Sequence, residues 1–220
     1  MKRILVLCLS IVCVAVSVNA HNNRYYNESG KLTNYWGVRL NLDNRITQSF
    51  RFCDSPYKPL GYGAGVSADM TYHVGLSRRF FIEPTVNIYF DTSNIWSDMY
   101  NKRLKHSGVL STAGIYLPMK IGLAIPTKNG FFAISTGVGA RFALFGKEKA
   151  RFYDNTVPAI SRNPFHILNR VSAAAIIGFT FTHSHFNYAM NVNADITDVM
   201  KRKDYTGQFT VVQFSVGYNF

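Results

Sequence analysis

Two combinations of serine and histidine are the residues of this chain that could carry covalent chemistry. His106 is followed directly by Ser107, and His166 lies shortly after Ser161. A serine activated by a histidine base can transfer or hydrolyse acyl groups when the fold brings the two side chains within hydrogen-bond reach. Neither combination belongs to a recognisable motif, and loop histidines are commonly solvated side chains. Acyl chemistry therefore stands as an alternative hypothesis.

Charged residues that interrupt apolar stretches form a second group of candidates. Leaving such a charge buried without a partner costs several kcal/mol, so each should have an opposite charge nearby. We expect three pairs, and we expect them to be structural, because carboxylate catalysis would need an accessible pocket that nothing in the sequence signals. The expected pairs are Arg39 with Asp69, Glu83 with Lys120, and Arg141 with Asp195.

The segments that must position these side chains alternate with period two over most of the chain. Apolar or aromatic residues at every second position are typical of a strand with two different faces. One face of these segments is apolar, aromatic or Thr throughout, whereas the other collects charged and amide residues. We expect eight strands, at 35–43, 61–74, 80–91, 109–123, 131–145, 171–181, 186–196 and 210–220.

The contrast between the two faces predicts the fold class. A soluble sandwich or lipocalin would put apolar residues inside and charged residues outside. Here the broader set of outward positions is apolar, which fits an all-β, eight-stranded antiparallel transmembrane β-barrel. Because side chains just fill a barrel of eight strands, we expect a packed polar lumen and not a diffusion pore.

The connections between strands support the same topology. Three of them are short, at 75–79, 125–130 and 182–185. The alternate connections are long, at 44–60, 92–108, 146–170 and 197–208. This is the pattern of short periplasmic turns and long extracellular loops. Pro84 and Pro118 fall within strands, where each removes a ladder donor, so a bulge or local break is expected at each.

Both ends of the chain predict export to the outer membrane. Lys2 and Arg3 precede an apolar run at 4–16, and Val18-Asn19-Ala20 fits a cleavage site. We therefore expect a signal peptide at 1–20, a periplasmic tail at 21–32 and the barrel at 33–220. The closing strand resembles the C-terminal assembly signal of Gram-negative outer-membrane barrels, which implies the barrel-assembly machinery as a partner in biogenesis. Its expected assembly residues are Phe214, Val216, Tyr218 and Phe220.

Four strand segments carry a resemblance to a known family. They are Gly37-Val38-Arg39-Leu40-Asn41-Leu42, Gly61-Tyr62-Gly63-Ala64-Gly65-Val66, Phe81-Ile82-Glu83-Pro84-Thr85-Val86 and Tyr116-Leu117-Pro118-Met119-Lys120. In order and spacing they resemble the PorT-type, outer-membrane protein A-like eight-stranded barrels of Bacteroidetes. The resemblance implies no shared catalytic residues, and it implies that a part in protein secretion is possible, since some members assist secretion.

Positive charge is concentrated in the four long connections. The formal net charge is +12, and removing Lys2 and Arg3 leaves +10. The long connections hold fourteen basic and six acidic residues, a net +8. Such a basic rim would face the phosphates of lipopolysaccharide, although ordinary solvated loop charge is an equal alternative. The candidate lipopolysaccharide contacts are Lys102, Arg103, Lys105, Lys201, Arg202 and Lys203.

These observations favour a non-catalytic barrel of the outer membrane that anchors, stabilises the envelope or docks a partner. We expect contact with outer-membrane lipid, and an envelope or secretion protein as a further candidate partner. The charge by itself does not indicate nucleic acid, and we expect neither a nucleic-acid partner nor a cofactor. The alternative from another class is an outer-leaflet lipid-modifying enzyme, an acyl hydrolase or transferase.

Overall fold

The computed structural model describes residues 24–52, 61–95, 104–152, 158–166, 168–201 and 205–220, so the predicted signal peptide lies outside the described residues. The described residues form nine strands and a short 3-10 helix. In chain order these are β1 Tyr35–Phe52, β2 Gly61–Gly75, β3 Phe80–Ile95, β4 Leu104–Thr127, β5 Gly130–Phe152, β6 Ile160–Arg162, η2 Pro164–His166, β7 Val171–His183, β8 Phe186–Asp195 and β9 Tyr205–Asn219. No helix among these residues is long and apolar enough to cross a membrane.

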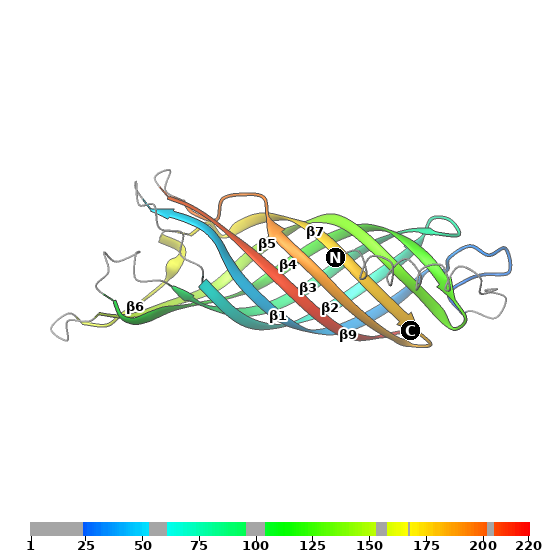
Figure 1. The fold of residues 1–220 in the computed structure, drawn as a ribbon, viewed down its shortest axis with the longest axis horizontal. Coiled ribbons are helices and arrows are strands. Elements are labelled where there is room, and N and C mark those ends of the chain that lie inside the picture. Colours follow the sequence, from blue (N-terminus) through cyan, green and yellow to red (C-terminus); the bar gives the residue numbers. More distant parts are fainter. Residues whose placement is uncertain (1–23, 53–60, 96–103, 153–157, 167, 202–204) are drawn as a thin grey trace, which may run out of the picture.

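Eight of the strands close into one antiparallel barrel (Figure 1). Each pairs with its neighbours in chain order, and β1 pairs with β9 along a seam from Gly37↔Asn219 to Phe52↔Tyr205. The prediction of an eight-stranded antiparallel barrel is confirmed. The remaining strand, β6, pairs only with the end of β5, from Glu148↔Arg162 to Ala150↔Ile160. Three residues are too few to show an alternating pattern, so the sequence did not predict β6.

On the extracellular side, several strands continue beyond the segment in which apolar residues alternate. Positions 44–52, 92–95, 104–108, 146–152 and 205–208, predicted as loop, belong to β1, β3, β4, β5 and β9. Pairing continues there, for example at Gln48↔Gln208 and Ser111↔Lys147. Above the membrane both faces of a strand meet water or loops, so the apolar alternation stops while the backbone ladder continues. The barrel wall therefore extends past the lipid.

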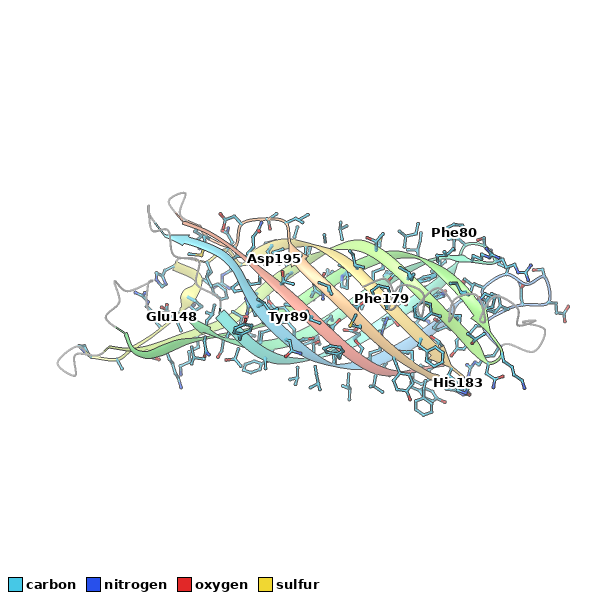
Figure 2. All side chains as sticks on the ribbon, in the orientation of Figure 1. Phe80, Tyr89, Glu148, Phe179, His183 and Asp195 are labelled. Carbon is cyan, nitrogen blue, oxygen red and sulfur yellow. The ribbon has the colours of Figure 1, made fainter. Side chains whose placement is uncertain are left out.

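The outer wall is apolar and the lumen is polar (Figure 2). Leu40 and Val138 on the outside are 73% and 61% exposed, whereas Arg39 and Lys120 inside are 3% and 4% exposed. The predicted assignment of faces is confirmed. In water this arrangement would leave the apolar side chains exposed, but in a bilayer the hydrocarbon solvates them and closure satisfies every strand edge. The chain is an outer-membrane β-barrel.

The two strand prolines interrupt pairing without changing the register. In the β2–β3 ladder, paired residues resume at Val74↔Ile82 after Thr71↔Thr85, which leaves Pro84 unpaired on that side. The β3–β4 ladder lapses between Pro84↔Met119 and Asn87↔Tyr116, opposite Pro118. The expected local break therefore occurs, because proline has no N–H to donate. The bulges lie elsewhere, including one at Ala113/Gly114.

Apolar clusters close the barrel at both ends. The extracellular cluster brings η2 and the loop before β9 over the mouth, and the periplasmic cluster brings in the segment that precedes β1. The extracellular cluster consists of Leu110, Phe165, Leu168, Val199, Met200 and Phe209. The periplasmic cluster consists of Tyr25, Tyr26, Leu32, Phe81, Ala124, Phe131 and Ala133.

Candidate functional site

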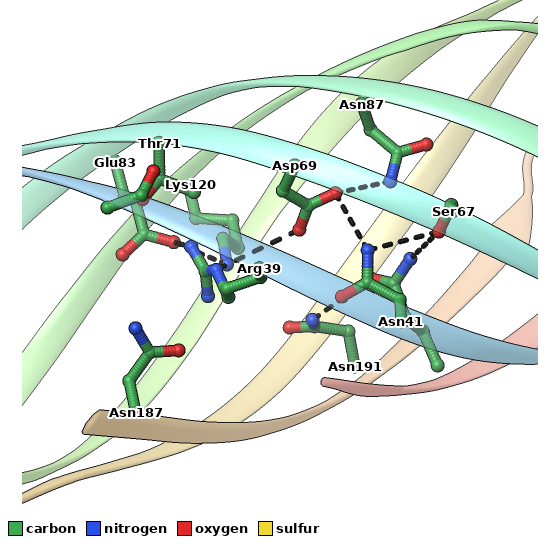
Figure 3. Close-up of polar contacts among 12 residues, drawn as sticks. Arg39, Asn41, Ser67, Asp69, Thr71, Glu83, Asn87, Lys120, Asn187 and Asn191 are labelled. Carbon is green, nitrogen blue, oxygen red and sulfur yellow. Dashed lines mark hydrogen bonds and ion pairs between the residues drawn. The ribbon is translucent and has the colours of Figure 1, made fainter. Parts of the chain in front are cut away.

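Glu83 on β3 is the centre of a buried charge network in the periplasmic half of the lumen (Figure 3). Its Oε1 accepts hydrogen bonds from Arg39 Nη2 of β1 and from Lys120 Nζ of β4, the latter at 2.7 Å. His73 Nδ1 of β2 lies 3.7 Å from Oε2. One carboxylate thus joins four consecutive strands, and two cations depend on it for charge balance.

The sequence-predicted pairs fall differently in the structure. Arg39 Nε lies 3.8 Å from Asp69 Oδ2, and both Arg39–Asp69 and Glu83–Lys120 are directly opposed residues of neighbouring strands. The bond from Arg39 to Glu83 was not predicted. It joins strands that are not neighbours, and the sequence alone does not show which side chains meet across a lumen.

Arg141 and Asp195 are not joined by an ion pair within 4.0 Å in the described part of the chain, so this predicted contact is not made. The Arg141 guanidinium instead lies over two rings, 5.3 Å from the centroids of both Tyr89 and Tyr116. The Asp195 carboxylate accepts the Phe209 backbone N–H at 3.2 Å. Aromatic faces attract a guanidinium by cation–π interaction, and these two tyrosines point into the lumen where the alternation predicts polar groups.

Amide and hydroxyl side chains fill the middle of the lumen (Figure 3). Asn41 Nδ2 donates to Ser67 Oγ at 3.0 Å and to Asp69 Oδ1 at 2.9 Å. Gln213 of β9 donates to the same Ser67 hydroxyl at 3.1 Å and accepts from Asn191 of β8 at 3.2 Å. These bonds link four consecutive strands across the β1–β9 seam, from β2 through β1 and β9 to β8, so the lumen is a polar core that is filled by side chains, as the strand count predicts.

The serine and histidine candidates for acyl chemistry are not assembled in the described residues. His166 is exposed in η2, and its Nδ1 contacts the backbone oxygen of Asn163 at 2.8 Å. Ser161 is exposed on β6, and no hydrogen bond joins it to His166 there. His106 and Ser107 lie on β4, in a part where only the backbone is described. Within the described chain, no group of three His, Cys, Asp or Glu residues could hold a metal ion.

The three other histidines among the described residues lie in the periplasmic half. His73 is fully buried between the rings of Tyr35 and Phe81, with centroid distances of 4.5 and 4.3 Å. His183 and His185 flank the β7–β8 turn, and His185 stacks on Tyr218 at 5.2 Å. None of the three is near the outer leaflet, where an acyl-modifying enzyme would act.

The segment before β1 plugs the periplasmic mouth. Residues 24–34 were predicted as the tail and the start of the barrel, but the side chain of Tyr25 is inserted between Tyr35 and Phe131 in edge-on contacts at 5.0 and 5.4 Å. Its hydroxyl donates to the Ser184 carbonyl and accepts from Asn219 Nδ2 at 3.1 Å. A tyrosine pair in an otherwise polar stretch was the sequence signal for burial.

Tyr26 is buried in the same plug, but its hydroxyl does not make hydrogen bonds as the Tyr25 hydroxyl does. Its hydroxyl has no hydrogen-bond partner, and burial raises the pKa of Tyr26 to about 12. Asn27 caps the tight turn that follows, with its side chain accepting the Lys31 N–H at 2.8 Å, and Gly30 adopts a φ of 74° that favours glycine. The plug is therefore a folded turn and not an extended tail.

The extracellular rim is described only in part. Lys102, Arg103, Arg202 and Lys203 lie outside the described residues, and Lys105 lies at the start of β4 where only its backbone is described. Lys201 is exposed, and its Nζ donates to the Phe165 carbonyl at 2.6 Å. Other exposed cations of this rim are Lys147, Lys149, Arg162 and Arg170. Glu148 is buried and pairs with Arg162 at 3.1 Å.

The closing strand presents its expected residues to the outside. The side chains of Phe214, Val216 and Tyr218 are exposed on the outer wall of β9, and that of Phe220, directly after the strand, is exposed as well. Tyr218 contacts Phe186 and Phe220 edge-on at 5.8 and 5.3 Å, and the Phe220 N–H donates to the Trp36 carbonyl at 2.8 Å. The aromatic end of the strand is thus part of the seam and of the aromatic girdle at the periplasmic interface.

In comparisons with known proteins, the chain is similar to solved structures only. No protein family and no curated protein matches the chain. The chain is similar to Ail, the attachment invasion locus protein of Yersinia pestis, in complex with the heparin analogue sucrose octasulfate, at 15% identity and a TM-score of 0.46. A second Ail crystal structure gives 12% and 0.44, and the Ail backbone structure in a phospholipid bilayer nanodisc gives 16% and 0.32. In each case the match covers 86% of this chain and 100% of the other.

Proposed function

We propose that this chain is a non-catalytic outer-membrane barrel whose basic extracellular rim binds the phosphates of lipopolysaccharide. In this proposal residues 1–20 serve as the export signal and Phe214, Val216, Tyr218 and Phe220 are read by the barrel-assembly machinery. The observation that carries the proposal is the concentration of exposed cations at the extracellular end. They stand just above an apolar wall, at the height where the outer leaflet presents its phosphates.

The described part of the rim supports this proposal by its charge balance. Its five exposed cations are opposed by Glu148, which is buried and already paired with Arg162, and by Asp198, whose carboxylate accepts two backbone N–H groups. Both of these described acids are thus engaged within the protein. The lysines and arginines that remain are available to external anions.

The lumen supports the non-catalytic part of the proposal. Arg39, Lys120 and Glu83 bond to one another, Arg141 lies over aromatic rings, and both mouths are covered by apolar clusters. Catalysis on a lipid would need a nucleophile that reaches the outer leaflet. No observation favours the enzyme over the binding protein, so the acyl hydrolase or transferase is not proposed.

The test replaces Lys102, Arg103, Lys105, Lys201, Arg202 and Lys203 with glutamine. Each basic group near an anionic surface contributes about 1 kcal/mol, and salt screens the long-range part. We expect at least about tenfold less lipopolysaccharide to co-purify with the variant at low salt, with a smaller difference at high salt. Migration of the unheated barrel in SDS gels checks that the variant is folded.

The control removes the five exposed cations described at the opposite end, with Arg24, Lys31, Arg78, Arg79 and Lys128 all changed to glutamine. This control should retain lipopolysaccharide as the unmodified barrel does. Equal retention by the extracellular variant, or retention that salt does not change, would contradict the proposal. Loss of a co-purifying protein in place of lipid would favour docking of an envelope or secretion partner.

A further inference from the structure

The periplasmic end of the barrel carries its own set of exposed cations, which we call the periplasmic collar. Arg24 and Lys31 belong to the plug, Arg78 and Arg79 to the β2–β3 turn, and Lys128 to the β4–β5 turn. Glu28 is the one exposed acidic side chain described at this end, so the side chains sum to a net charge of +4. In Figure 1 the plug and both turns gather at the end of the barrel opposite η2.

Backbone hydrogen bonds hold the parts of the collar in place. The Leu32 N–H donates to the Ser77 carbonyl at 3.1 Å, which fixes the plug to the β2–β3 turn. The Ala124 N–H donates to the Arg79 carbonyl at 2.6 Å, and the Ser184 N–H donates to the Asn129 carbonyl at 2.7 Å. Because the plug and the turns are bonded to their neighbours, their charged residues lie on one connected surface.

The collar cations are not neutralised within the protein. No ion pair within 4.0 Å joins Arg24, Lys31, Arg78, Arg79 or Lys128 to a carboxylate of the described chain. Of these five cations, only Arg24 lies over an aromatic ring of the described residues, 5.4 Å from the centroid of Tyr25. This contrasts with the lumen, where Arg39 and Lys120 share Glu83. Five unpaired cations on one surface produce a field that attracts anions.

The collar begins where the lipid-facing wall ends. Leu76 and Phe80 stand on either side of the β2–β3 turn and are 47% and 52% exposed on the outer wall. Phe186, Tyr218 and Phe220 continue the exposed aromatic girdle around the same end. Aromatic girdles lie at the membrane–water interface, so cations directly beyond them are at the level of the lipid headgroups.

We propose that the periplasmic collar binds the phosphates of anionic phospholipids in the periplasmic leaflet. A guanidinium matches a phosphate with two parallel hydrogen bonds, and Arg78 and Arg79 sit between two side chains embedded in lipid. Because these cations directly adjoin the hydrocarbon-facing wall, a lipid is favoured as the ligand. Peptidoglycan or a soluble protein would contact the tips of the turns but not the wall. The proposal concerns the opposite leaflet from the proposed function and does not depend on it.

The experiment compares lipid retention by the folded full-length barrel in vesicles of phosphatidylglycerol and phosphatidylcholine with identical acyl chains. Phospholipid molecules retained after gentle extraction are counted by native mass spectrometry. The test variant is Arg78→Gln/Arg79→Gln/Lys128→Gln. We expect it to lose the preference for phosphatidylglycerol by about tenfold, because three interfacial cations are removed. Retention of phosphatidylcholine should not change.

The matched control is Arg78→Lys/Arg79→Lys/Lys128→Arg, which changes the same three side chains, keeps their charge and should keep most of the preference. An unchanged preference in the test variant, or an equal loss in the control, would overturn the proposal. So would loss of binding to isolated peptidoglycan sacculi with lipid retention intact. A preference that added salt weakens in the unmodified barrel, but not in the test variant, would support it.

Discussion

Replacing Glu83 with glutamine should unfold the barrel at much lower urea, because the substitution leaves two buried cations without their shared carboxylate. Removing one member of a buried ion pair costs about 3–5 kcal/mol. Arg39 keeps Asp69 at 3.8 Å, so most of the loss falls on Lys120, whose ammonium contacts Glu83 at 2.7 Å. We expect a loss of about 3–5 kcal/mol in the free energy of unfolding, measured by urea titration of the barrel in lipid vesicles with tryptophan fluorescence.

A second substitution tests whether charge balance is the cause. Lys120→Met removes the stranded ammonium, so Glu83→Gln/Lys120→Met should be more stable than Glu83→Gln alone. The double-mutant cycle should give a coupling of at least about 2 kcal/mol. Ser215→Ala is the lumen control and should be nearly neutral, since the Ser215 hydroxyl has no hydrogen-bond partner. If Lys120→Met destabilises the Glu83→Gln barrel as much as it destabilises the original, the reasoning is refuted.

Three further predictions concern the wall, the closing strand and the plug. Val138→Arg should cost about 2–4 kcal/mol of stability in vesicles, whereas Asn191→Ser should cost less than about 1 kcal/mol, because only the first puts a charge in hydrocarbon. Deletion of Phe220 should lower the amount of heat-modifiable barrel in the outer membrane, and undiminished assembly would remove its role as a signal. Because burial raises the pKa of Tyr26 to about 12, stability should fall as pH rises from about 10 to 12. Tyr26→Phe should remove this fall in the free energy of unfolding between pH 10 and 12 and should leave stability at pH 8 unchanged. Tyr25→Phe, in contrast, should lower stability at pH 8, because it removes two hydrogen bonds.

Much of the wall could be predicted because lipid imposes a simple rule on it. Every second residue of a membrane-spanning strand must be apolar, and Leu40, Val138 and Phe214 obey this rule within strands that were read correctly. The pairs Arg39–Asp69 and Glu83–Lys120 were predicted from the position of each residue along adjacent strands. This position can be counted from the strand ends in the sequence.

What could not be predicted depends on geometry across the lumen or beyond the membrane. The bond from Arg39 to Glu83 requires the curvature that brings β1 and β3 together, and the position of Arg141 depends on two tyrosines from β3 and β4. The extension of β1 to Phe52 depends on its partner β9, not on its own composition. The plug was read as a tail because its polar turn hides two buried tyrosines.

The partners of Tyr25 set the order in which the molecule can be completed. Its hydroxyl bonds to Ser184, in the β7–β8 turn, and to Asn219, at the end of the last strand. Ser184 and Asn219 lie on the β8–β9 side of the seam, whereas the Leu32 N–H of the same plug bonds to Ser77 on the β2–β3 side. The plug can therefore make all of these bonds only after β9 has paired with β1. The plug must therefore complete its docking after the seam has closed, although it precedes every described strand in the chain. Protection of this segment from a periplasmic protease would report that the seam has closed, and a barrel stalled with β9 unpaired would be cut there.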